Sequence, residues 1–255
     1  MTVTTKKAAA TAAALDDLEA EQADLEAVLR SLEEDDWARP TPAAGWDVRD
    51  QVAHLADTEE VARGTATGGA RNLNEEAARY PTAEDYMLSG VLKGRTMTPT
   101  KVLEWWVGAA RENRAALRAL DPEGRVPWGL GMSLRAFAAA RIMEHWAHGL
   151  DIRAAVDRPN TDTDRLRHVA WISAQAVPYA LNFIGLAAPE RHTLRFELTG
   201  PDCAFGPADA TDVVRGPTGQ WCRLAVQRIS RADAPDLTAD GPLAELTLQH
   251  ARAFL

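Results

Sequence analysis

Apolar residues recur at helical spacing through most of the first 160 residues. Over residues 14–34 they lie on one face and charged residues fill the other, which predicts an amphipathic helix. The same pattern predicts a second helix from an N-cap at Asp47 to about Arg63, a third over residues 100–120, and a fourth from the cap Ser133 to about Val156. Amphipathic helices of this length and number predict a helical bundle.

The connections between these helices differ in length. Residues 35–45 contain Pro40, Pro42 and Gly45 and are predicted to form a loop. Residues 64–98 are rich in Gly, Asn, Pro and charge, which predicts a long connection with a short helix near residues 83–92. A connection of this length is unusual in a bundle and is often functional, for instance as a wall over a site.

The pattern changes near residue 188. Leu194, Phe196 and Leu198 alternate with polar residues, which predicts a half-buried strand over residues 193–199. A second short strand is expected at residues 212–215, a helix from Pro217 to residue 229, and a last helix from Pro242 to residue 254. We therefore expect a disordered tail over 1–12, a bundle over 13–160, a connecting helix over 161–187 that includes a helical stretch at 164–184, and a small α/β module over 188–255.

Composition excludes several classes of protein. The net charge of −9, with no long basic run, argues against a nucleic-acid partner. The two cysteines, Cys203 and Cys222, do not form a disulfide framework, which favours a reducing, cytoplasmic location. No stretch has the roughly 18 consecutive apolar residues that a membrane span requires, and the N-terminus lacks the apolar core of a signal peptide. Every amphipathic face can be buried within one bundle, so the pattern favours no particular oligomeric state.

The fourth predicted helix carries an unusual polar stripe. Glu144 and His148 are four residues apart and project from one face, while the ends of that face are apolar. Burying a carboxylate and an imidazole is costly unless they are paired or bind a metal. Zinc accepts His nitrogen and Glu oxygen at about 2.0–2.2 Å, and catalytic zinc sites commonly use three protein ligands.

A third ligand is expected from a separate helix, and His54 on the second helix is the candidate. Asp57 and Asp151 follow His54 and His148 by three residues and are candidates for auxiliary groups. His145 points about 100° away from Glu144 and is interpreted as structural or exposed. The alternative to a metal site is an ordinary polar pair, either solvated or satisfied in the core, which the pattern alone favours.

Two segments resemble the signatures of a known superfamily. GWDVRDQVAHL at residues 45–55 resembles the first signature of the DinB-like, mycothiol-dependent maleylpyruvate isomerase superfamily, and MEHWAHGLDI at residues 143–152 resembles the second. In that family a zinc ion is held by a His of the first motif and by the Glu and His of the second. The resemblance therefore implies a mainly α protein with a DinB-like four-helix bundle, in which His54, Glu144 and His148 hold the metal.

The C-terminal region resembles the same superfamily. GQWCRLAVQR at residues 219–228 and DGPLAE at residues 240–245 resemble an actinobacterial subgroup with a sterol-carrier-like C-terminal segment. In the isomerase an arginine of this module helps to bind the anionic substrate, which implies Arg228 as a catalytic residue here, with Arg223 as the alternative. The isomerase has Gly before that arginine, whereas this chain has Gln227, which places the substrate class in doubt.

The resemblance implies an enzyme that uses Zn²⁺, or another divalent metal, and mycothiol for isomerisation or S-transfer on a small anionic or electrophilic metabolite. A metal favours the thiolate, which is the nucleophilic form of a thiol. One alternative is a thiol-independent lyase, hydratase or rearrangement enzyme with the metal as Lewis acid. Another is a non-catalytic carrier of an apolar small molecule, which leaves the polar stripe unexplained. Trp46, Trp106 and Trp146 are candidates for a cavity wall or for core packing.

Overall fold

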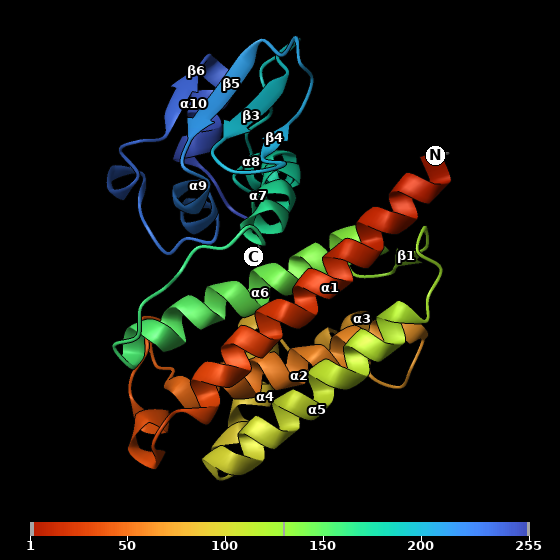
Figure 1. Cartoon of the computed structure of the whole chain (residues 1–255), viewed down its shortest axis with the longest axis vertical. Coiled ribbons are helices and arrows are strands. Elements are labelled where there is room, and N and C mark those ends of the chain that lie inside the picture. Colours follow the sequence, from red (N-terminus) through yellow and green to blue (C-terminus); the bar gives the residue numbers. More distant parts are fainter. Residues whose placement is uncertain (1–2, 130, 254–255) are drawn as a thin grey trace. The chain divides into compact units, whose positions relative to one another are not determined.

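The structure, a computed structural model that describes residues 3–129 and 131–253, divides the chain into the units Met1–Asn160 and Thr161–Leu255 (Figure 1). The first unit is the expected bundle, and the second is a small α/β unit, so the predicted fold class is confirmed. The long helices of the first unit are α1 (Val3–Arg30), α2 (Val48–Thr67), α5 (Pro99–Arg118) and α6 (Leu134–Ala155). Its shorter elements are η1 (Glu34–Ala38), α3 (Leu73–Ala77), α4 (Ala83–Arg95), β1 (Arg125–Val126) and β2 (Met132–Ser133).

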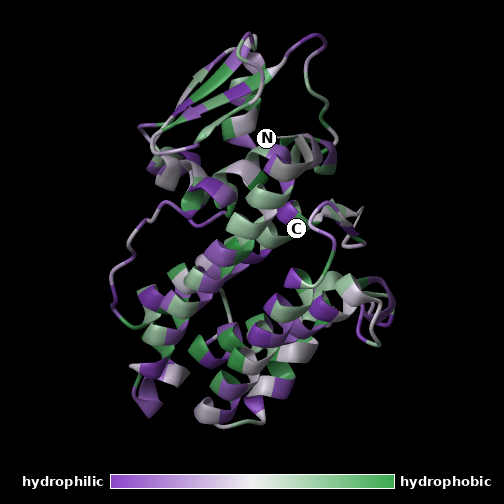
Figure 2. Ribbon diagram, turned by 45° about the vertical axis from the view of Figure 1, so that its right-hand side comes forward, coloured by the Kyte–Doolittle hydropathy of each residue, from purple (hydrophilic) through white to green (hydrophobic). Residues whose placement is uncertain are grey.

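Local sequence signals set the beginnings of the long helices. Asp47 caps α2 through the backbone N–H of Asp50, whose side chain accepts in return from the N–H of Asp47. Thr98 caps α5 ahead of a proline, and Ser133 caps α6. Hydrophobic and hydrophilic residues alternate along these helices, as amphipathic helices require (Figure 2). The apolar positions of α2 and α5 meet in a core around the fully buried Trp106.

The first helix is longer than the sequence pattern indicated. Residues 3–12, which were expected to lie in a disordered tail, belong to α1. This stretch is rich in alanine, the residue with the highest helix propensity, and part of it is buried. Thr11 is buried and its hydroxyl donates to the carbonyl of Pro122 at 3.0 Å. Tertiary contact thus extends the helix where the amphipathic pattern is weak.

The long connection after α2 packs closely on that helix. A Cβ atom at Gly94 of α4 would lie 2.2 Å from Cβ of Ala53, and one at Gly90 would lie 2.6 Å from Cβ of Asp57. Both glycines therefore permit an approach that a side chain would prevent. Ala53 and Asp57 flank His54 on α2, so the predicted wall lies against the turns that carry this candidate ligand.

The second unit contains a four-stranded sheet in the order β4-β3-β5-β6. Its central strands run parallel, with Phe196 opposite Val214, and both edge strands are antiparallel to their neighbours. The ring of Trp221 packs on Phe196 at 4.7 Å, and its indole N–H donates to the carbonyl of Ala170. The elements of this unit are α7 (Leu166–Gln175), α8 (Val177–Phe183), β3 (Leu194–Leu198), β4 (Ala204–Phe205), β5 (Asp212–Gly216), α9 (Thr218–Ala225), η2 (Arg231–Asp233), β6 (Thr238–Asp240) and α10 (Pro242–Gln249).

Several predicted boundaries in this unit differ from the structure. The helical stretch expected over 164–184 is two helices, because the chain breaks at Ala176, shortly before Pro178. These helices belong to the same compact unit as the sheet, not to a separate connection over 161–187. The helix expected to reach residue 229 ends at Ala225, since Gln227 has a left-handed backbone with φ of 57°. The last helix ends at Gln249, and the predicted end at residue 254 lies outside the described residues.

In the part of the chain that the structure describes, no helix combines the length and apolar character needed to cross a membrane.

Candidate metal centre

Helices α2 and α6 bring His54, Glu144 and His148 together. Nε2 of His54 lies 3.9 Å from Oε2 of Glu144, and Nε2 of His148 lies 3.6 Å from the same oxygen. One potential ligand atom from each residue lies within 4.8 Å of the other two. His54 is buried, and the other two side chains are partly accessible. Among the described residues, these three form the group of His, Cys, Asp or Glu side chains whose ligand atoms lie close enough together to hold a metal ion.

The spacing suits a divalent cation. Bonds of about 2.1 Å in a tetrahedral zinc site separate neighbouring ligand atoms by about 3.4 Å. Both separations between a histidine and Glu144 are within about half an ångström of that value. Two imidazole nitrogens and one carboxylate oxygen form a typical three-ligand set for catalytic zinc, with a further position open to a small molecule.

The protonation states of the ligands also suit a metal. Burial lowers the pKa of His54, although the contact with Glu144 opposes this shift. Burial alone would raise the pKa of Glu144, but interactions with His148 and His54 hold it well below its ordinary value. A neutral imidazole and an ionised carboxylate are the forms that bind metal.

Gln51 contacts the ring nitrogen of His148 that does not face Glu144, and Asp151 lies beside Gln51. Nδ1 of His148 is hydrogen-bonded to Oε1 of Gln51, and the amide nitrogen of Gln51 donates to the hydroxyl of Thr41 at 2.9 Å. The same amide nitrogen lies 3.5 Å from a carboxylate oxygen of Asp151. Asp151 is thus connected to His148 through Gln51, and its role as an auxiliary group stays a prediction.

An indole ring lies beside the two candidate imidazole ligands. The ring centre of Trp46 is 5.1 Å from that of His54 and 6.2 Å from that of His148, with the second pair nearly parallel. Thr41 holds the backbone of Trp46, because both its N–H and its hydroxyl donate to the Trp46 carbonyl. Trp46 is thus a tryptophan beside the site, and the other two candidates, Trp106 and Trp146, are buried.

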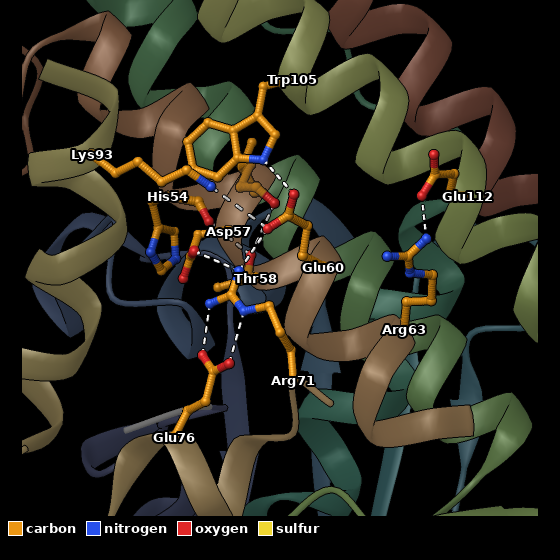
Figure 3. A network of polar contacts seen from close by, with 11 residues as sticks. His54, Asp57, Thr58, Glu60, Arg63, Arg71, Glu76, Lys93, Trp105 and Glu112 are labelled. Atoms are coloured by element: carbon orange, nitrogen blue, oxygen red, sulfur yellow. Dashed lines mark hydrogen bonds and ion pairs between the residues drawn. The ribbon is translucent and has the colours of Figure 1, made fainter. Parts of the chain in front are cut away.

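Asp57 pairs with an arginine from the long connection. Arg71 donates to Asp57 at 2.9 Å and to Glu60 at 2.6 Å. It also donates two parallel hydrogen bonds to the carboxylate of Glu76 (Figure 3). These contacts fasten α3 to α2 one turn beyond His54. The Asp57 carboxylate, a candidate for an auxiliary group, is part of this charge network.

A second polar cluster lies one turn before Glu144 on α6. Arg141 is buried and donates from Nε to the fully buried Glu59 at 2.7 Å and from a terminal nitrogen to the hydroxyl of Thr58 at 3.1 Å. Asn113 donates to the other oxygen of Glu59 at 2.7 Å. Burial opposes ionisation of Glu59, but the charge of Arg141 lowers its pKa below the ordinary value.

His145 has a structural position. It is fully buried, its Nδ1 donates to the carbonyl of Arg141 at 2.8 Å, and its Nε2 accepts from the indole of Trp106 at 3.2 Å. Burial lowers its pKa to about 4. Of the two interpretations from the sequence, structural and exposed, the structure agrees with the first.

The two arginines singled out in the C-terminal region lie in and just after α9. Arg223 forms two hydrogen bonds with the carboxylate of Asp162, at 2.6 and 2.9 Å. Arg228 follows the left-handed Gln227, and one terminal nitrogen donates to the carbonyl of Val226 at 2.9 Å. The role of Arg228 in binding a substrate stays a prediction.

Sequence reasoning missed Gln51 and the pairing of Thr58 and Glu59 with Arg141. A signal for Gln51 was present, because it precedes His54 by three residues and so shares its face of α2. The partner of Asp57 carried no such signal, since Arg71 lies in a connection without periodicity.

Comparisons with known proteins agree with this architecture. The family described as "Mycothiol maleylpyruvate isomerase N-terminal domain" matches residues 18–153, a range that includes all three candidate ligands. Two uncharacterized proteins of Mycobacterium tuberculosis are each 35% identical to this chain over 244 residues. Each match covers 93% of this chain and 93% of the relative.

Two solved structures share the fold. They are crystal structures of the mycothiol-dependent maleylpyruvate isomerase, one of them a histidine-to-alanine mutant, with TM-scores of 0.55 and 0.56. Each match covers 94% of this chain and 95% of the isomerase, at 16% and 14% sequence identity respectively. The chain therefore belongs to the mycothiol maleylpyruvate isomerase N-terminal domain family.

Proposed function

We propose that this protein is a zinc-dependent enzyme that uses mycothiol for isomerisation of, or S-transfer to, a small anionic or electrophilic metabolite. The observation that carries the proposal is the convergence of two imidazoles and a carboxylate from α2 and α6. The family membership and the shared fold support mycothiol as the co-substrate.

His54, Glu144 and His148 would hold the metal, which when bound supplies a positive charge that favours the thiolate form of a thiol. The side chains around the ligands support this role. Gln51 is hydrogen-bonded to the His148 ring, and the indole of Trp46 lies beside both imidazoles. Arg228 is the residue of this chain that we propose to bind a substrate carboxylate through a charge-assisted contact.

Metal analysis of the purified protein tests the proposal directly. We expect about one zinc per chain in the wild type and little in His54→Ala or Glu144→Ala. His192→Ala is the matched control, because His192 is partly exposed and pairs with Asp212 in the second unit. Wild-type protein that takes up no divalent metal under saturating conditions contradicts the proposal.

Thermal unfolding in the presence of mycothiol tests the second half. A ligand that binds the folded state raises the melting temperature according to its concentration and affinity. We expect mycothiol to stabilise the zinc-loaded wild type and to have no effect on His54→Ala. Zinc uptake without any response to mycothiol would instead favour the thiol-independent lyase, hydratase or rearrangement enzyme.

A further inference from the structure

The two helices that supply the candidate ligands are linked by polar pairs at three successive turns. Gln51 of α2 contacts His148 of α6, His54 lies near Glu144, and Thr58 contacts Arg141. The candidate metal ligands thus have a cross-link on either side. Of the two cross-links, the one through Gln51 contacts a ligand directly.

The hydrogen bonds around Gln51 determine which way its amide points. The single hydroxyl hydrogen of Thr41 is donated to the carbonyl of Trp46 at 2.9 Å, so this oxygen must accept from Gln51. The carboxylate of Asp151, on the same side, is also an acceptor when ionised. The amide nitrogen of Gln51 therefore faces Thr41 and Asp151, and its oxygen faces His148.

This orientation has a consequence for the imidazole of His148. An amide oxygen accepts and does not donate, so Nδ1 of His148 must carry the hydrogen of their shared bond. The ring atom that stays available to a cation is Nε2, which already faces Glu144. Without the amide, the neutral ring can place its hydrogen on either nitrogen and can rotate about its bond to Cβ.

We propose that Gln51 is a positioning residue that fixes the tautomer and the orientation of His148, so that Nε2 is presented to the metal. The inference rests on the proposed metal site and adds to it a residue outside the ligand set. Gln51 is fully buried and Asp151 nearly so, which protects these hydrogen bonds from exchange with water. Thr41 connects the arrangement to the loop that carries Trp46, so that one set of bonds orients both a ligand and the adjacent indole.

Gln51→Met tests the proposal, because methionine keeps the length of the side chain and removes both hydrogen-bonding groups. Gln22→Met is the matched control. Gln22 is also buried and also contacts a histidine of α6, but that histidine is His145, which is not a candidate ligand. Thr41→Val is a second test variant, which keeps the shape of the loop residue while removing the hydroxyl that orients the amide.

Two measurements separate positioning from a purely structural role. The first is zinc affinity by competition with a chromogenic chelator, where the loss of a group that orients a ligand typically weakens binding by about 10- to 100-fold. We expect that loss for Gln51→Met, a smaller loss for Thr41→Val, and affinity within about threefold of the wild type for Gln22→Met. The second is the ¹⁵N spectrum of the histidine side chains in metal-free protein at alkaline pH. We expect the hydrogen of His148 on Nδ1 in the wild type and distributed over both nitrogens in Gln51→Met.

The outcomes are distinct. A wild type without zinc affinity overturns the proposed function and this inference together. A wild type that binds zinc, with a Gln51→Met variant that binds equally well and keeps the hydrogen of His148 on Nδ1, overturns only the role of Gln51. Equal weakening in Gln51→Met and Gln22→Met also overturns it, because it would show a general effect of core substitution. If Gln51→Met does not fold, the Thr41→Val variant decides between the same results.

Discussion

The buried ion pair between Glu59 and Arg141 offers a quantitative test of how α2 and α6 are held together. The Glu59 side chain is 0% exposed and that of Arg141 is 3% exposed. Removing one member of such a pair leaves an uncompensated charge in the core and costs about 3–5 kcal/mol of unfolding free energy. We expect a loss of this size for Glu59→Gln and for Arg141→Met.

The double variant should lose far less than its two parents combined. In Glu59→Gln/Arg141→Met no charge is left in the cluster, and the new amide oxygen can still accept from Asn113. Thr58 loses the donor Arg141 but keeps its own bond to the His54 carbonyl. We therefore expect a loss of about 1–2 kcal/mol, which is the usual cost of a broken buried hydrogen bond.

Urea denaturation followed by circular dichroism measures the three free energies, and hydrogen exchange in α2 and α6 locates the change. The reasoning is refuted if the sum of the two single losses equals the loss of the double variant within about 0.5 kcal/mol. Such additivity would mean that the two residues do not interact.

The same pair gives a pH dependence with a definite sign. Although burial opposes it, Arg141 lowers the pKa of Glu59 in the folded protein below its ordinary value of 4.5. The stabilisation is therefore fully present above that value and is lost as the pH falls below it. In Arg141→Met the buried carboxyl becomes easier to protonate, which removes its unpaired charge. The stability difference between the wild type and this variant should narrow from pH 7 to pH 4, and a constant difference would contradict the assignment.

Four further substitutions test other parts of the structure. Gly94→Ala forces a Cβ into the side chain of Ala53 and should cost about 1–3 kcal/mol of unfolding free energy. Gly108→Ala is its control, because the new Cβ meets no atom within 4 Å and should stabilise α5 by about 0.5–1 kcal/mol. Urea titration measures both free energies, and equal effects would contradict the close packing of α4 on α2. Asp212→Ala removes the buried carboxylate that accepts from a backbone N–H in the first turn of α10, and it should cost about 1–3 kcal/mol of unfolding free energy. Hydrogen exchange in α10 should become faster, and unchanged exchange there would exclude this role of Asp212. Arg228→Ala should raise KM for an anionic substrate by at least tenfold with a smaller effect on kcat, and an unchanged KM would remove this residue from the substrate site.

The convergence of His54, Glu144 and His148 could be predicted because helical geometry alone places Glu144 and His148 on one face. A bundle then requires any third ligand to come from a separate helix. The paired motifs identified His54 as that ligand. Metal binding itself stays a prediction, although the three ligand atoms lie as close together as the hypothesis demanded.

The surroundings of the site depend on tertiary contacts that no local pattern reveals. Asp57 has the spacing of an auxiliary group, yet Arg71 reaches it from the irregular connection after α2. The end of α9 depends on the left-handed conformation of Gln227, a residue type that carries no strong signal for it. The edge strands β4 and β6 have two and three residues, too short for an alternating pattern to be recognised.

The carboxylates Glu59 and Glu144 lie at neighbouring turns of the α2–α6 contact but differ in their partners. Glu59 has hydrogen-bond donors within the protein, whereas the surroundings of Glu144 suit a cation. Glu59 accepts hydrogen bonds from a guanidinium and an amide nitrogen at 2.7 Å each, and Nε2 of His145 lies 3.8 Å from the oxygen that binds the guanidinium. Glu144 instead faces the Nε2 atoms of His54 and His148 at 3.9 and 3.6 Å, which are beyond hydrogen-bond length. With its hydrogen on Nδ1, the neutral His148 ring can only accept at Nε2, and the ionised carboxylate of Glu144 is also an acceptor, so these two atoms cannot hydrogen-bond to each other. A divalent cation at their centre would bind all three at once.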